Sequence, residues 1–329
     1  MRLAHFANPS PRPAKGFLLP IAGMLVVLVI AACTGAAPTP KPSPTVAAAF
    51  PVTLTGDDGK TVTLAARPQR IVSLMPGETE TLFAIGAGDR VVGKVEDIAN
   101  YPPDAASVPV IATYQGVDVE KIVGLNSDLV IVGSNGGTPQ AAIDQLRNLN
   151  LPVLAVYASD VEGVLKDIEL TGQATGDGDA AKDLTASMRA QFDQVAAATK
   201  SVDKARVFYE TGNEPALYGV ADDSFVSSMI ALAGAEPLTT GSSTNWEMPQ
   251  EKLIAADPQV ILLGDAAYGV SATDVAARPG WSTLTAVKDS AIYPIDDIVV
   301  TRPGPRLAAG LAALVAAIHP DIVLATATP

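Results

Sequence analysis

The sequence predicts an α/β protein of two similar lobes, each with a parallel-type sheet, and three observations support this fold class. The segment at residues 120–133 recurs at residues 251–264 without a gap, at an offset of 131 residues. Each copy contains a short apolar helix, a turn, and four consecutive aliphatic residues that end at glycine. Aliphatic runs of this kind are typical of strands that a parallel sheet buries on both faces. The length of 329 residues also exceeds the usual size of one domain, so each copy is expected in its own lobe.

Residues 1–32 have the pattern of an export signal. They contain three basic residues and no acidic residue, and residues 17–32 are uncharged. This apolar run is shorter than a membrane-spanning helix requires. It ends in Ile30-Ala31-Ala32-Cys33, which resembles a bacterial lipobox, and Cys33 is the only cysteine of the chain. We therefore expect Cys33 to carry the lipid that anchors the protein to a membrane; an ordinary secretion signal with an incidental cysteine is the alternative.

Charge and composition exclude several classes of function. The net charge is −13, and it becomes −16 once the three basic residues of the signal are removed, so nucleic acid is not an expected partner. The only histidines are His5, inside the signal, and His319, at the end of the last predicted helix. A hydrolase needs a base beside its nucleophile and a catalytic zinc needs His or Cys ligands, so we expect no enzyme, no metal site and no cofactor.

The first half of the chain has a short entry region and then the N-terminal lobe. Residues 33–50 are rich in Pro, Ala and Thr, which predicts an extended tether. Residues 51–66 alternate apolar and polar side chains around a Gly-Asp-Asp-Gly turn, which predicts a β-hairpin. The N-terminal lobe is expected at residues 67–158. Its predicted strands lie at 70–74, from 91, at 129–132 and at 153–157, and its helices at 78–85, from 120, and at 140–148, with a loop at 113–116.

Residues 159–203 are expected to form the helices that connect the lobes, with one break near residues 172–178. Apolar residues follow a helical spacing between 179 and 200. A helix of about 20 residues reaches roughly 30 Å, enough to cross from one lobe to the other. Asp177, Asp179 and Asp183 are expected near the start of this helix, where acidic side chains suit the helix dipole.

The C-terminal lobe is expected at residues 204–320 and repeats the order of the first. A strand at 206–209 and a helix at 224–233 precede the second copy of the repeat. A strand at 292–295 and an apolar helix at 307–318 follow it, and residues 321–329 are expected to form a disordered tail.

Several short motifs, in this order, carry a family resemblance. They are the segments 68–74, 79–80, 101–103, 114–116 and 304–306, together with Trp246 and both copies of the repeat. Over residues 70–320 the chain resembles ABC-importer substrate-binding lipoproteins of the Fe/B12 periplasmic-binding family, most closely the cobalamin binders. The resemblance implies two lobes joined by one long interlobe α-helix, a stiff connection that permits only modest closure. It also implies capture of a corrinoid; a ferric siderophore or haem as ligand, and a lipid-anchored sensor as function, are the alternatives.

The resemblance also implies partners and a location. In the family, one glutamate on each lobe docks onto arginines of the permease dimer, and Glu120 and Glu251 fall on those positions. Equivalent charges suit a twofold-symmetric partner, and carboxylates pair well with arginine; a glutamate that only complements the helix dipole is the alternative. We expect a monomer, lipid-anchored on the outer face of the cytoplasmic membrane, that works with an ABC permease and its ATPase.

The expected ligand is a flat metal chelate, which requires aromatic walls and a few polar anchors. By analogy with the family, the ligand-binding residues are expected to be Tyr114, Gln115, Tyr218, Trp246, Tyr268 and Arg302. Trp281, which follows Pro279-Gly280, is expected to be structural.

Overall fold

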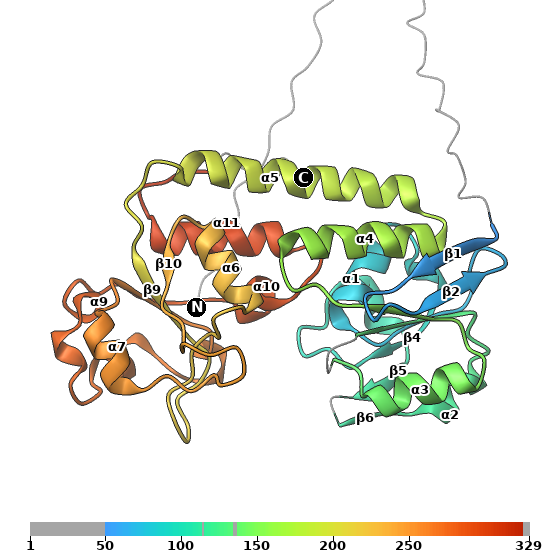
Figure 1. The fold of residues 1–329 in the computed structure, drawn as a ribbon, viewed down its shortest axis with the longest axis horizontal. Helices are drawn as coiled ribbons and strands as arrows, with labels where there is room; N and C mark the ends of the chain where they lie inside the picture. Colours follow the sequence, from blue (N-terminus) through green and yellow to red (C-terminus); the bar gives the residue numbers. More distant parts are fainter. Residues whose placement is uncertain (1–49, 114, 134–136, 325–329) are drawn as a thin grey trace, which may run out of the picture. The chain divides into compact units, whose positions relative to one another are not determined.

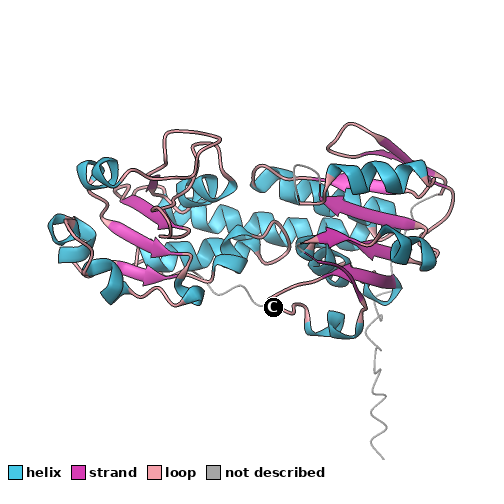
Figure 2. Cartoon of the chain, turned by 90° about the horizontal axis from the view of Figure 1, so that it is seen from below, coloured by secondary structure: helices cyan, strands magenta, loops and turns pink. Residues whose placement is uncertain are grey.

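Two separate sheets organise the part of the chain that the structure describes, and Figures 1 and 2 show them on either side of a set of helices. The computed structural model describes residues 50–113, 115–133 and 137–324. Cys33, the predicted signal and the tether up to residue 49 lie outside the described residues, and so does Tyr114. Within the described ranges no helix is long and apolar enough to cross a membrane.

The N-terminal sheet has six strands in the order β6-β5-β4-β3-β7-β8. All neighbouring pairs are parallel except β5 and β6, which are antiparallel. The strands are β3 (Ile71–Ser73), β4 (Val91–Val95), β5 (Val110–Thr113), β6 (Gly116–Val117), β7 (Leu129–Gly133) and β8 (Val153–Val156). Its helices are α1 (Pro76–Ala84), η1 (Gly88–Arg90), η2 (Pro103–Ser107), α2 (Val119–Gly124) and α3 (Gln140–Asn148). Strand β6 begins at Gly116, the last residue of the segment for which a loop was predicted.

The C-terminal sheet has four parallel strands in the order β10-β9-β11-β12. The strands are β9 (Arg206–Glu210), β10 (Glu236–Pro237), β11 (Val260–Leu263) and β12 (Ile292–Pro294). Its helices are α6 (Phe225–Leu232), α7 (Gln250–Ala256), η3 (Ala266–Tyr268), α8 (Ala272–Ala276), η4 (Trp281–Thr283), α9 (Thr285–Lys288), α10 (Asp297–Thr301) and α11 (Leu307–Ile318). This order matches β4-β3-β7-β8 of the first sheet, so the prediction of two similar α/β lobes is confirmed.

The sequence repeat folds the same way in both lobes. Asn126 and Asp257 occupy equivalent positions, and both adopt positive φ, at 50° and 47°. An arginine at the start of the first strand of each lobe then donates from its Nε to a carbonyl at the end of the repeat helix. Arg70 bonds the carbonyl of Leu125 at 2.6 Å and Arg206 that of Ala256 at 2.9 Å. In each lobe, therefore, the same turn and the same arginine hydrogen bond hold the repeat helix against the sheet.

One long helix crosses from the N-terminal lobe to the C-terminal lobe, as predicted, and a second long helix precedes it. Helix α4 (Val161–Thr175) ends at Gly176, whose φ of 77° allows the chain to reverse, and α5 (Gly178–Thr199) follows. Figure 1 shows α5 running over both lobes with α11 beneath it. One hydrophobic core includes residues from both sheets and from α4, α5 and α11, among them Leu129, Leu262 and Leu311. The helices therefore share one apolar layer with both sheets.

The two ends of the described chain also pack on this core. The predicted hairpin is present as β1 (Val52–Thr55) and β2 (Thr61–Leu64), and its Leu54 and Leu64 are buried. At the other end, Ile322 and Leu324 pack against the same core. The prediction of disorder from residue 321 is therefore wrong for residues 321–324, because their apolar side chains bury surface on the fold; residues 325–329 lie outside the described residues.

Candidate functional site

A cavity of about 310 Å³ lies at the carboxyl ends of the N-terminal strands. In open α/β sheets ligands bind at this edge of the sheet. The walls are mostly apolar, with Leu74 and Met75 after β3, Val95 at the end of β4, and Val117 in β6. Thr113 adds a hydroxyl at the end of β5, so the cavity suits an apolar group that also carries polar substituents.

A second cavity, of about 530 Å³, lies at the carboxyl ends of the C-terminal strands. Its walls are polar and acidic where those of the first are apolar. They come from Thr211 and Gly212 after β9, Asp265 after β11, Tyr268 in η3, and Asp274 in α8. The two lobes therefore carry cavities at equivalent edges but of different chemistry.

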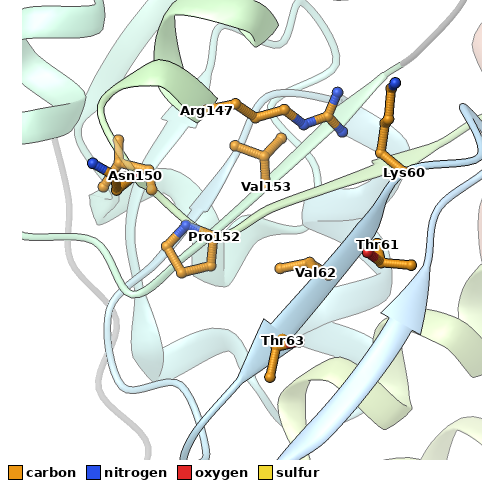
Figure 3. A pocket seen from close by; sticks show the side chains of 9 residues that line it. Lys60, Thr61, Val62, Thr63, Arg147, Asn150, Pro152 and Val153 are labelled. Carbon is orange, nitrogen blue, oxygen red and sulfur yellow. The ribbon is translucent and has the colours of Figure 1, made fainter.

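A third cavity, of about 450 Å³, lies between strand β2 and the turn from α3 to β8, as Figure 3 shows. Lys60 and Arg147 line it, and Arg147 forms an ion pair with Asp58 at 2.7 Å. It lies away from the carboxyl ends of the strands and contains none of the predicted site residues. We therefore take the two strand-end cavities as the candidate site.

Ion pairs join the lobes next to these edges. Arg302, which follows α10, bonds Asp97, which follows β4, through contacts of 2.7 and 3.0 Å. Its Nη1 also donates to Glu80 of α1 at 2.8 Å. Arg306 bonds both oxygens of Glu80 and lies 4.0 Å from the ring centroid of Tyr101. These contacts tie the segment after α10 to helix α1 and to the loop after β4.

The electrostatics of this cluster favour its ionised form. Burial by itself raises the pKa of Asp97, but hydrogen bonds from Arg302 and from backbone amides outweigh it and hold the pKa below the usual range. Burial lowers the pKa of Arg302, while bonds to Asp97 and Glu80 raise it more. Both terminal nitrogens of Arg302 donate hydrogen bonds to carboxylates. Removing one partner of such a buried pair lowers the free energy of unfolding by roughly 3–5 kcal/mol.

The C-terminal lobe has a separate acidic cluster beside its cavity. The carboxylate of Glu210, at the end of β9, is fully buried and receives two hydrogen bonds of 2.6 Å from Arg278. Burial raises the pKa of Glu210, and Arg278 opposes that shift. Asp265 lies beside it, and neither of its buried carboxylate oxygens has a hydrogen-bond partner among the described residues.

A scan against family models now identifies the fold. The periplasmic binding protein family matches residues 71–299, more than half of the chain. The chain belongs to the periplasmic binding protein family. It is therefore an extracytoplasmic substrate-binding protein of an ABC importer, which works with a permease and an ATPase, and it is not an enzyme.

Individual relatives agree with this assignment. A Bacillus subtilis protein described as an uncharacterized ABC transporter substrate-binding lipoprotein is 35% identical over 278 residues, covering 83% of this chain and 87% of that protein. The vitamin B12-binding protein of Pectobacterium atrosepticum is 26% identical over 248 residues, covering 74% of this chain and 85% of that protein.

Solved structures show the same fold. The periplasmic vitamin B12-binding protein of Vibrio cholerae has a TM-score of 0.68 at 23% identity, covering 77% of this chain and 97% of that chain. A periplasmic haem-binding protein from Roseiflexus sp. RS-1 has a TM-score of 0.67 at 26% identity, covering 77% of this chain and 98% of that chain.

Two of the predicted ligand residues of this periplasmic binding protein, Tyr268 and Tyr218, lie at or beside the C-terminal cavity. Tyr268 lines the C-terminal cavity and is 77% exposed. Half-buried Tyr218 forms antiparallel bridges with Gly212, which also lines that cavity, and with Glu247. Trp246 is 42% exposed, and its carbonyl accepts from Gly219. These three aromatic residues therefore come together in one lobe.

On the N-terminal side, exposed Gln115 lies between Thr113 and Gly116, which both line the first cavity. Arg302 faces Glu80 and Asp97, two acids that sequence reasoning missed. Strand ends point to Asp97 and Asp265, because Asp97 follows β4 closely and Asp265 follows the glycine that ends the second repeat; Glu80 lies within α1 and has no such signal.

Glu120 and Glu251 both lie in the first turn of the repeat helix, in α2 and α7. Both are exposed, and neither bonds another described residue through its carboxylate. In Figure 1 the two helices lie on the side of the drawn unit that faces away from α5. Trp281, by contrast, is 1% exposed in the core of the C-terminal lobe, which confirms its predicted structural role.

Proposed function

We propose that this protein captures a cobalamin-type corrinoid outside the cytoplasmic membrane and delivers it to its permease. The observation that carries the proposal is the pair of cavities at equivalent strand ends of two lobes that the bond between Arg302 and Asp97 joins. A ligand that contacts both lobes must be large, and its two sides must differ in polarity. The vitamin B12-binding names of several relatives supply the chemical class.

The ligand is proposed to lie against aromatic side chains from both lobes. Tyr268, Trp246 and Tyr218 offer exposed or half-exposed rings on the C-terminal side. Gln115 precedes strand β6 between residues that line the N-terminal cavity, and Tyr114, the aromatic residue proposed for this side, lies outside the described residues. Aromatic rings on both sides of a flat macrocycle would bury its faces.

Arg302 is proposed to shape the site by holding the lobes at a fixed spacing. Both of its terminal nitrogens bond carboxylates from the N-terminal lobe. A Cβ at Gly77 would collide with the carbonyl oxygen of Pro303, so the backbone after Arg302 also lies directly against α1. This close contact supports a site whose width changes little on binding.

Delivery is proposed to use Glu120 and Glu251 as matching contacts for the two permease subunits. Their exposure and their equivalent positions in the repeat support this role. We also propose a lipid anchor at Cys33 and a monomeric state. The anchor is supported by the lipoprotein description of the Bacillus subtilis relative.

Titration of the full chain in detergent tests the ligand class. We expect quenching of tryptophan fluorescence by cyanocobalamin and cobinamide at micromolar concentration or below, because Trp246 is exposed beside the proposed site. The Trp246→Phe variant should lose most of this quenching, since the remaining tryptophan, Trp281, is buried. Absence of binding by both corrinoids would overturn the proposal.

Haem is the second candidate ligand, because a haem-binding structural neighbour is 26% identical to this chain. The same titration should therefore include haemin and a ferric hydroxamate siderophore. Tight binding of haemin without corrinoid binding would replace the corrinoid proposal by a haem carrier of the same fold.

A further inference from the structure

The acidic cavity of the C-terminal lobe contains a carboxylate that the fold leaves without a partner. Asp265 is 4% exposed and lines the cavity, and neither of its oxygens accepts a hydrogen bond from a described residue. Burying a charged group without hydrogen bonds costs several kcal/mol, so native proteins rarely leave one unsatisfied. A buried acceptor that faces a cavity indicates a missing donor.

The neighbouring residues do not supply that donor. Glu210 lies beside Asp265, and each oxygen of Glu210 accepts one hydrogen bond from Arg278, so Glu210 is itself an acceptor and the contact between the two acids raises its pKa. Arg278 bonds Glu210 and makes no hydrogen bond to Asp265, whose two oxygens have no donor among the described residues.

The occupant of this cavity is therefore expected to donate hydrogen bonds. The described residues contain no group of three or more His, Cys, Asp or Glu side chains that could hold a metal ion. Glu214 and Asp274 also line the cavity, so a carboxylate entering it would meet several like charges. Arg302 and Arg306, which could neutralise such a group, already bond Glu80 and Asp97.

We infer that Asp265 accepts a hydrogen bond from a primary amide of the ligand, and that this contact selects amide-bearing chelates over carboxylate-bearing ones. The inference rests on the proposed corrinoid function and names the part of the ligand that the C-terminal lobe recognises. Corrinoids carry primary amide side chains around the macrocycle, whereas haem carries propionate carboxylates. The acidic cavity therefore discriminates between the two ligands by charge.

The test uses cyanocobalamin and its monocarboxylic acids, in which one peripheral amide has been hydrolysed. Calorimetric titration of the full chain should give a dissociation constant about tenfold or more weaker for at least one of these acids than for cyanocobalamin. In Asp265→Asn this preference should disappear, because the side chain loses its charge and gains an amide donor. Exposed Asp289→Asn, in the same lobe, should keep the preference of the wild type.

Thermal unfolding without ligand separates recognition from a structural role. Because the side chain of Asp265 is buried and accepts no hydrogen bond from a described residue, Asp265→Asn should unfold at a higher temperature than the wild type. A lower unfolding temperature would show that Asp265 makes stabilising contacts within the fold and would overturn the inference. Equal affinity of the wild type for cyanocobalamin and all its monocarboxylic acids, or a preference that persists in Asp265→Asn, would also overturn it. Failure of the wild type to bind any corrinoid would instead overturn the proposed function itself.

Discussion

At the scale of single residues, helices α1 and α4 each contain a buried acid whose pKa is raised. Burial raises the pKa of Glu78 to about 7, although a hydrogen bond from Thr171 opposes the shift. Burial raises the pKa of Asp167 to about 9, and the neighbouring carboxyl of Asp57 acts in the same direction. These acids keep their protons in the folded state at pH values where the unfolded chain releases them.

Replacing Glu78 with Gln should therefore reduce the dependence of stability on pH. In the wild type the unfolded chain loses the Glu78 proton above pH 4.5, while the folded state keeps it until about pH 7. Stability is thus lost as the pH rises through this window. The free energy of unfolding of Glu78→Gln relative to the wild type should increase by roughly 2–3 kcal/mol between pH 5 and pH 8. Urea denaturation at both pH values measures the difference.

Gln can still accept the 2.8 Å hydrogen bond from Thr171, so the variant changes the charge and little else. Exposed Glu236→Gln serves as the matched control and should show no such increase. A stability difference between Glu78→Gln and the wild type that is the same at pH 5 and pH 8 would contradict the raised pKa.

At the scale of elements, the connecting helices depend on close contact at one glycine. Gly172 of α4 faces Ala181 of α5, and a Cβ at Gly172 would collide with the Cβ of Ala181. Near this contact, Asp177 precedes α5 and forms ion pairs with Arg67 and Arg90. Asp177 is the N-cap residue of α5 and Asp179 lies in its first turn, as predicted. The side chain of Asp177 makes no capping hydrogen bond and pairs with the two arginines of the N-terminal lobe.

Gly172→Ala should force α4 and α5 apart and lower the free energy of unfolding by roughly 1–3 kcal/mol. Gly178→Ala, at the start of α5, is the matched control because nothing lies within 4 Å of its Cβ position. Removing that glycine should be neutral or should stabilise the protein by about 0.5 kcal/mol. Urea denaturation measures both changes, and equal effects of the two variants would contradict the close packing.

At the scale of the whole molecule, three features oppose a large separation of the lobes. Helix α5 runs over both lobes, one apolar core includes residues from both sheets, and two arginines bond acids of the N-terminal lobe. A binding protein of this kind presents its two docking acids at a nearly constant spacing. Such a surface suits a dimeric partner whose two arginine sites are also fixed.

The double variant Glu120→Arg/Glu251→Arg should therefore abolish delivery without affecting capture. Uptake into proteoliposomes that contain the permease and its ATPase should fall by about tenfold or more, because two attractive contacts become repulsive. Corrinoid affinity should not change, since neither residue lines a strand-end cavity.

The control for this experiment is Asp193→Arg/Glu236→Arg, which changes the net charge by the same amount at two exposed positions outside the repeat. It should leave uptake close to that of the wild type. Unchanged uptake in the Glu120/Glu251 double variant would remove the docking proposal.

The fold follows from patterns that are local in sequence. Apolar spacing and four-residue aliphatic runs predicted the repeated helix, turn and strand. The structure contains the helix and the strand of both copies. The long connecting helix followed from a helical period over residues 179–200, and the last helix from an apolar stretch at 307–318. A helix or strand buries one face, and the apolar side chains of that face recur at a fixed spacing along the sequence. The sequence alone therefore determined these elements.

The chemistry of the site was decided by the tertiary structure. The bonds between Arg302 and the acids Glu80 and Asp97 join residues more than 200 positions apart. The unpartnered state of Asp265 depends on Arg278 bonding Glu210 instead, which no spacing along the chain could show. An ion pair or an unsatisfied carboxylate depends on which side chains meet once the sheets and helices pack, and on how much water that packing excludes.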